Sequence, residues 1–232
     1  MSLDRIDAAP LARALSLFGF GAAAAGLPGR VLALDLCERV IIATLYGSFA
    51  WRMLQNYSGH VDVSTMLIVF SEALPLLFVI LRAPSATLSQ RPTDWALAIT
   101  ATISPLMVQP NENLAGPVGP EALAYAIMLF GFCVQISAKA VLGRAFGIVA
   151  ANHGVRQVGP YRFVRHPMYA GYTLAHFGFL LAMPSLFNTA VYTIALILQL
   201  VRITREEQVL MRDPIYVAFA KRVRYRLLPG VY

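Results

Sequence analysis

The chain has 232 residues, of which 58% are hydrophobic and 13% charged, and its formal net charge is +7. Soluble globular proteins contain about 25% charged residues, so this composition excludes an ordinary soluble domain and indicates a membrane protein. The two cysteines, Cys37 and Cys133, have no metal-site spacing and lie in or beside apolar segments. We therefore expect both to be small buried hydrophobic residues rather than ligands or a disulfide.

Apolar runs of about 20 residues predict as many as seven membrane-spanning helices. They lie near residues 11–28, 38–56, 63–81, 94–110, 120–141, 168–184 and 186–203. The first run is interrupted by Arg13 and contains "GFGAAAAGLPG", which is rich in poor helix formers, so a re-entrant or interfacial helix is the alternative there. The predicted fold class is all-α: a polytopic integral membrane protein with six or seven transmembrane helices and a C-terminal cytoplasmic or interfacial helix.

The basic residues predict the orientation of the chain. With seven spans, 16 of the 19 arginines and lysines fall on the side of the C-terminus, and only Arg5, Arg13 and Arg52 fall on the other. Cytoplasmic loops carry the excess of basic residues in membrane proteins, which places the C-terminus in the cytoplasm. A basic face against anionic lipid accounts for the net charge, so no nucleic-acid partner is expected.

The segment "NENLAGPVGP", residues 111–120, is the best internal boundary of the chain. It separates N-terminal transmembrane helices (1–119) from a core (120–232) that holds nearly all of the candidate motifs. The predicted topology places this boundary on the side of the membrane opposite to the cytoplasm.

Polar side chains gather in "GPYRFVRHPMYAG", residues 159–171, between two apolar stretches. The preceding loop contains Gly147 and other glycines, which let backbone N–H groups approach a ligand closely. His166 precedes Pro167, and proline restrains the backbone before it, so the histidine side chain is aimed rather than mobile. The alternative is an ordinary cytoplasmic surface loop that carries positive charge.

The predicted sixth span combines a polar face with a face of small residues. Tyr169, Tyr172 and His176 recur at helical spacing. The small residues, on which another helix can pack closely, are Gly171, Ala175 and Gly178. An ionisable residue inside a span is a functional candidate, and a hydrogen-bonded structural histidine is the alternative for His176.

The last span continues into the charged segment "VRITREEQVLMRDPIYVAFAKRVRYRLLPGVY". Arg202 and Glu206 are four residues apart and can pair on a helix. Asp213 suits the N-cap of a further amphipathic helix. We expect its apolar side to carry Ile215, Phe219 and Val223, and its basic residues to contact anionic lipid, namely Arg222, Arg224 and Arg226.

Three separate blocks resemble the isoprenylcysteine carboxyl methyltransferase family and its relatives among the phospholipid N-methyltransferases. They are "LGRAFGIVAANHGVRQVGPYRFVRHPMYAGY", "REEQVL" and "YVAFAKRVRYRLLPG", and together they cover about residues 125–230. The chain departs from the family at Asp213-Pro214, where a glycine is expected, and at Phe219, where tyrosine is common.

The resemblance implies a pocket for S-adenosylmethionine. This cofactor carries a carboxylate, an ammonium, a ribose and a sulfonium, so it needs basic, acidic, backbone and aromatic partners. The cofactor-binding residues implied are Tyr161, Arg165, His166, Pro167, Tyr169, Gly171, Glu206 and Glu207, with Leu142 and Gly147 in a further wall. No metal is implied, because alignment and electrostatics lower the barrier to methyl transfer. The candidates for the catalytic and acceptor side are Arg202, Arg205, Tyr172 and His176.

The predicted function is that of an integral membrane methyltransferase that acts on a lipophilic acceptor. The carboxylate of an isoprenylcysteine-like or other lipid is favoured, and a phospholipid amine or a thiol is the alternative. A nicotinamide-dependent reductase of the sterol type and a non-catalytic membrane protein remain open.

The two adjacent acids are expected to differ in role, because neighbouring helical residues point about 100° apart. Glu206 can be held by Arg202, which leaves Glu207 freer to turn toward the cofactor. The rotation of the helix is unknown from the sequence, so the reverse assignment is the alternative.

The charge asymmetry generates a prediction about topology: residues 142–167 are cytoplasmic and residues 111–119 face the opposite side. A cysteine placed at Gln157 should resist a membrane-impermeant reagent in intact cells, whereas one at Asn113 should react, with the unsubstituted chain as the background control. Labelling at Gln157 but not at Asn113 would contradict the predicted orientation.

Overall fold

The computed structural model describes residues 7–16, 27–55, 63, 65–70, 77, 92–109, 116–142 and 156–232. Over these residues the chain is helical without any strand, which confirms the predicted all-α class. The helices are α1 (Ala8–Ser16), α3 (Gly29–Gln55), α5 (Pro92–Leu106), α6 (Glu121–Leu142), the short 3-10 helix η3 (Gly159–Arg162), α7 (Pro167–Ala182), α8 (Leu186–Leu210) and α9 (Pro214–Arg222). Gly147 and most of the predicted first and third spans lie outside the described residues.

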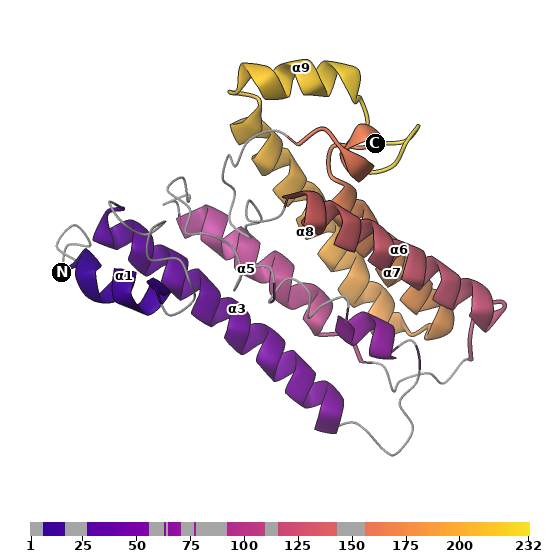
Figure 1. The fold of residues 1–232 in the computed structure, drawn as a ribbon. Helices are drawn as coiled ribbons and strands as arrows, with labels where there is room; N and C mark the ends of the chain where they lie inside the picture. The colour runs from indigo at the N-terminus through magenta and orange to yellow at the C-terminus, as the bar shows by residue number, and fades with distance from the viewer. Residues whose placement is uncertain are drawn as a thin grey trace.

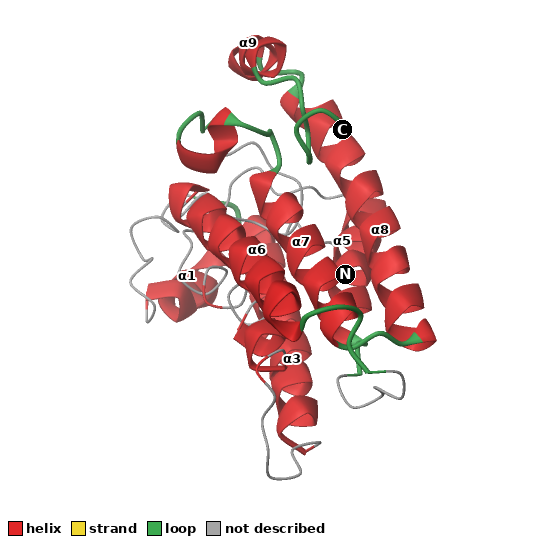
Figure 2. Cartoon of the chain, turned by 90° about the vertical axis from the view of Figure 1, so that its right-hand side faces the viewer, coloured by secondary structure: helices red, strands yellow, loops and turns green. Residues whose placement is uncertain are grey.

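The long helices α6, α7 and α8 lie together, and α5 packs against α8 (Figure 1). The helix α3 contacts α5 and carries α1 on its surface. Asn188, near the start of α8, exchanges two hydrogen bonds of 3.0 Å with the backbone of Gln109, which ties the segment after α5 to the bundle. The helix α9 lies across the far end of α8, and the C-terminus returns to the same end (Figure 1; Figure 2).

Small residues let α6 and α7 approach each other closely, as predicted from the glycine face of the sixth span. A Cβ atom built on Gly171 would lie 2.6 Å from the carbonyl oxygen of Gly131, and one on Gly178 would lie 2.8 Å from that of Ala124. Real Cβ atoms do not come so near to backbone, so only glycine fits at these positions. Close backbone approach through glycine and alanine is the usual way in which helices associate inside a membrane.

Two helices among the described residues are long and apolar enough to cross a membrane, α6 and α8. Only 28% of the apolar stretch in each is buried within the protein, and exposed residues such as Phe130 and Ile197 lie along them. Outward-facing apolar residues on long helices are typical of contact with lipid. The helices α5 and α7 are shorter, with 15 and 16 residues. The number of six or seven spans therefore stays a prediction.

Two basic residues that the topology prediction counted on the side of the C-terminus lie buried within helices. Arg39 belongs to α3 and pairs with Asp35 at 2.8 Å, with 7% of its surface exposed. Lys139 belongs to α6 and is fully buried, and its Nζ donates to Oε1 of Gln135 at 3.0 Å. Each lies inside a predicted span, 38–56 or 120–141, and has a polar partner one helical turn before it.

Two expectations about burial are wrong. Cys37 and Cys133 are free thiols and both are exposed, because they lie on outward faces of α3 and α6. In α9, Phe219 is buried as expected, but Ile215 is 62% exposed and Tyr216 takes the inward position. Asp213 does cap this helix, since its Oδ1 accepts a hydrogen bond of 2.8 Å from the backbone N–H of Ile215.

The α6–α7 contact predicts that Gly171→Ala lowers the free energy of unfolding by about 1–3 kcal/mol, because the added methyl group overlaps the backbone of α6. Gly47→Ala is the matched control, since a Cβ atom at this position on α3 meets nothing within 4 Å. Thermal unfolding of both variants in detergent is the measurement. Equal unfolding temperatures for the two variants would contradict the close contact.

Candidate functional site

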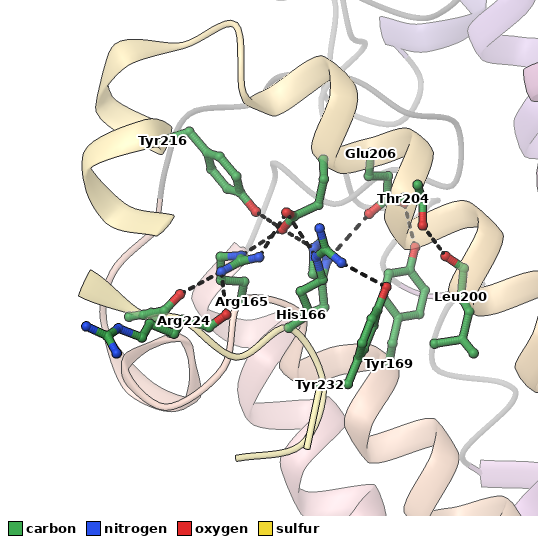
Figure 3. Close-up of polar contacts among 12 residues, drawn as sticks. Arg165, His166, Tyr169, Leu200, Thr204, Glu206, Tyr216, Arg224 and Tyr232 are labelled. Atoms are coloured by element: carbon green, nitrogen blue, oxygen red, sulfur yellow. Dashed lines mark hydrogen bonds and ion pairs between the residues drawn. The ribbon is translucent and has the colours of Figure 1, made fainter. Parts of the chain in front are cut away.

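Three segments distant in sequence meet at the end of the bundle where α9 lies: the residues that precede α7, the last turns of α8, and the C-terminal tail (Figure 3). The backbone N–H of Arg165 donates to the carbonyl of Tyr225 at 2.9 Å, and that of His166 to the carbonyl of Arg226 at 2.8 Å. The tail therefore runs beside the start of α7 and closes this end of the molecule.

The carboxylate of Glu207 lies at the centre of the polar contacts that join these segments, and the residue is only 3% exposed. Arg165 approaches it in a bidentate fashion, with Nε 2.7 Å from Oε1 and Nη2 3.0 Å from Oε2. The hydroxyl of Tyr216 donates to Oε1 at 2.8 Å, and Nε of Arg226 donates to Oε2 at 3.2 Å. His166 adds a contact of 3.0 Å from Nε2 to Oε1. The carboxylate is thus saturated with donors from the residues before α7, from α9 and from the tail.

Arg165 is fixed by further bonds. Its Nη1 donates to the carbonyl oxygens of Val223 and Arg224, at 2.8 and 2.7 Å. A guanidinium satisfied on both edges holds a single orientation, because each lost donor would leave a buried charge partly unsolvated. Arg165 and Glu207 together join the tail to the bundle.

Glu206 lies beside this pair and is more open, with 19% of its side chain exposed. Its Oε1 accepts a hydrogen bond of 2.6 Å from the hydroxyl of Tyr169 and one of 3.1 Å from Nε of Arg202. This confirms the expected pairing of Arg202 with Glu206. Its other oxygen, Oε2, lies 3.8 Å from Nδ1 of His166, beyond hydrogen-bond distance.

His166 is aimed at both acids. A carboxylate oxygen can only accept, so Nε2 of His166 carries the proton that it shares with Glu207. In the neutral ring the lone pair therefore lies on Nδ1, the nitrogen on the side of Glu206. Nδ1 of His166 and Oε2 of Glu206 lie 3.8 Å apart on one side of the cluster.

Burial and negative charge keep the nearby phenols protonated. Burial in the first place, and the carboxylate of Glu207 in the second, raise the pKa of Tyr216 well above its usual value. Burial and the charge of Glu206 likewise raise the pKa of Tyr161. Both tyrosines are therefore hydrogen-bond donors near neutral pH, and neither is a base.

Deeper between the helices, cations lie over the rings of α7. The guanidinium of Arg202 lies 5.5 Å from the ring centre of Tyr169, and Nζ of Lys139 lies 4.8 Å from that of Tyr172. His176 is 5% exposed and stacks on Tyr192 of α8, with ring centres 4.1 Å apart. This packing accounts for His176, and its role in an acceptor path stays a prediction, as does that of Tyr172.

The structure brings most of the predicted site residues together. Those that meet at the cluster are Arg165, His166, Tyr169, Arg202, Glu206 and Glu207, with Tyr161 buried nearby in η3. Pro167 begins α7, Gly171 faces α6, and Leu142 packs at the end of α6. Arg205 is exposed and contacts none of the cluster residues that the structure describes.

The sequence analysis missed two members of the cluster. Tyr216 was not considered, and Arg226 was assigned to anionic lipid rather than to Glu207. Glu207 and Tyr216 are nine residues apart and are separated by a turn, so the periodicity of a single helix does not predict their contact. Glu207 is also the more buried of the two acids and Glu206 the more open, the opposite of the expected freedom, because the rotation of α8 turns Glu207 inward; which acid meets the cofactor stays a prediction.

Residues 121–217 match the family model of phospholipid methyltransferases. The matched segment begins with α6 and ends in α9, so it contains Arg165, His166 and both acids. The match confirms, over these residues, the resemblance to the phospholipid methyltransferases that the sequence predicted. No curated protein matches the chain.

The Glu207 contacts generate a prediction about stability. Glu207→Gln should lower the free energy of unfolding by about 3–5 kcal/mol, because Arg165 is left as a buried charge without its carboxylate. Glu206→Gln is the matched control and should lower it by less, since its side chain is more exposed. Unfolding temperatures in detergent measure both, and a greater loss in the Glu206 variant would show that Glu207 does not hold the three segments together.

Proposed function

We propose that the protein is a multi-pass membrane enzyme that transfers a methyl group from S-adenosylmethionine to a lipophilic acceptor, with the cofactor site on the cytoplasmic side. The family match of residues 121–217 supports methyl transfer. The apolar, largely unburied helices α6 and α8 support residence in a membrane. The polar cluster at one end of these helices supports a meeting point between a water-soluble donor and an acceptor in the bilayer.

The residues of the cluster fit this cofactor. A molecule with an ammonium, a sulfonium and ribose hydroxyls needs acceptor atoms that the protein has not already used. Glu207 has no unused acceptor atom, because its two oxygens receive five contacts from four side chains. Glu206 has one, since the described residues place no hydrogen bond on Oε2, and Nδ1 of His166 lies 3.8 Å from it.

The open oxygen of Glu206 is the observation that carries the proposal. Tyr169 and Arg202 hold Oε1 and so fix the carboxylate plane, which directs Oε2 away from both. A fixed charge of this kind binds a cation without reorganising when the cation arrives. The cofactor, when bound, supplies an activated methyl group, and the chain holds the donor at the mouth of the bundle.

The acceptor approaches from the bilayer in this proposal. Its nucleophilic atom forms a bond to the methyl carbon while the carbon–sulfur bond breaks and its electron pair stays on sulfur. Alignment of the two partners lowers the barrier, and helices that hold donor and acceptor in line supply it. The family match favours a phospholipid head group over the carboxylate of an isoprenylcysteine-like lipid, which remains the second candidate.

Transfer of label tests the proposed function directly. Purified protein in detergent is incubated with methyl-labelled S-adenosylmethionine and, separately, with phosphatidylethanolamine or a lipophilic carboxylic acid. We expect label in one lipid fraction, together with S-adenosylhomocysteine. Protection against thermal unfolding by NADPH instead of S-adenosylmethionine would favour a reductase and overturn the proposal.

The position of Glu206 generates a prediction about cofactor affinity. Glu206→Gln keeps the shape of the side chain and removes its charge, so it should weaken S-adenosylmethionine binding by about 1–3 kcal/mol, the scale of a charge-assisted hydrogen bond. Calorimetric titration in detergent is the measurement. Glu121→Gln is the matched control, because this exposed acid lies at the opposite end of α6. The same affinity in both variants would remove Glu206 from the cofactor site.

A further inference from the structure

The side-chain carbonyl oxygen of a buried amide in α8 accepts no hydrogen bond from the described residues. Gln199 is 6% exposed, and no described residue donates to its Oε1. Gln135 in α6 offers a direct comparison, because it is fully buried and its Oε1 accepts from Lys139 at 3.0 Å. The chain therefore satisfies one of these buried glutamines and leaves the carbonyl oxygen of the other unsatisfied.

Such an oxygen is unfavourable for folding. Buried polar groups in native proteins nearly always have a partner, and an unsatisfied one destabilises the folded state. The penalty is greater in an apolar helix such as α8, where neighbouring lipid cannot donate hydrogen bonds. Polar side chains are rare and costly inside a membrane, so an unsatisfied one is a candidate for ligand binding.

Gln199 lies on the inward stripe of α8, between Tyr192 and Glu207 at spacings of seven and eight residues. Tyr192 stacks on His176 of α7, and Glu207 contacts His166 at the start of the same helix. The stripe thus faces α7 at both ends. Gln199 lies seven residues before Glu206, about 10 Å along the helix axis, on the bilayer side of the open carboxylate.

We propose that Gln199 binds the polar head of the methyl acceptor and that this head donates a hydrogen bond, as an amine or a hydroxyl does. The inference rests on the proposed function and names a property of its acceptor. A carboxylate presents only acceptor atoms, so it can accept from the side-chain N–H groups of Gln199 but leaves Oε1 unsatisfied. A donor in the head group satisfies the buried oxygen and fixes the head below the cofactor site.

The test compares Gln199→Leu with Gln135→Leu, a matched change at the partnered glutamine. Binding is measured without S-adenosylmethionine, as the rise in unfolding temperature when the protein is titrated with a short-chain lipid. The four probes, used one at a time, are phosphatidylethanolamine, monoacylglycerol, phosphatidylcholine and a fatty acid anion. The first two heads donate hydrogen bonds through N–H or O–H, whereas the head of phosphatidylcholine and the ionised acid do not. This readout needs no methyl transfer. The preference for a donor head can therefore be absent while methyl transfer is observed, or present while methyl transfer is not observed.

We expect the wild-type protein to prefer a donor head, and Gln199→Leu to weaken that binding about tenfold, or 1.4 kcal/mol. The unliganded Gln199→Leu variant should unfold at the same or a higher temperature, because an unsatisfied amide is removed. Gln135→Leu should unfold at a lower temperature and keep the preference. Equal stabilisation by all four probes, no stabilisation by any, or unchanged binding in Gln199→Leu would overturn the inference.

Discussion

The bidentate contact between Arg165 and Glu207 is the interaction on which the polar end of the molecule depends. Each partner is buried, and a buried charge persists only with a counter-charge and a full set of hydrogen bonds. The tail supplies the rest of that set through the carbonyls of Val223 and Arg224 and the side chain of Arg226. These contacts hold three segments in one fixed arrangement: the residues before α7, the end of α8 and the tail.

The α6–α7 contact determines where this arrangement sits. Gly131 and Gly171 bring the two backbones together, so one face of α7 is used for packing on α6. Tyr169 and Tyr172 are then left to meet Arg202 and Lys139. Small residues thus do more than join two helices, because they decide which side chains of α7 remain available to the site.

Local spacing in the sequence predicted those contacts that one helix determines. Arg202 pairs with Glu206 four residues away, and Asp213 caps the helix that follows it. Contacts that depend on helix rotation or on the path of the tail were not predictable in this way. The burial of Ile215 and of the two adjacent acids differs from the expectation, because a pattern defines the faces of a helix without saying which neighbour each face meets. Polar residues inside apolar runs, Gln199 among them, were a signal that the sequence analysis did not use.

The two neighbouring acids show how a helix end can combine rigidity with binding. Because adjacent side chains diverge by about 100°, one carboxylate can be consumed by the scaffold while the other faces the opening. Glu207 is saturated and fixes His166, and His166 in turn places Nδ1 beside the open oxygen of Glu206. The carboxylate of Glu207 thus orients His166, whereas Tyr169 and Arg202 hold the carboxylate of Glu206. The geometry of both acids comes from side chains of the protein, Arg165, Arg202 and Tyr169 among them, so the proposed cofactor site needs no ligand to fix it.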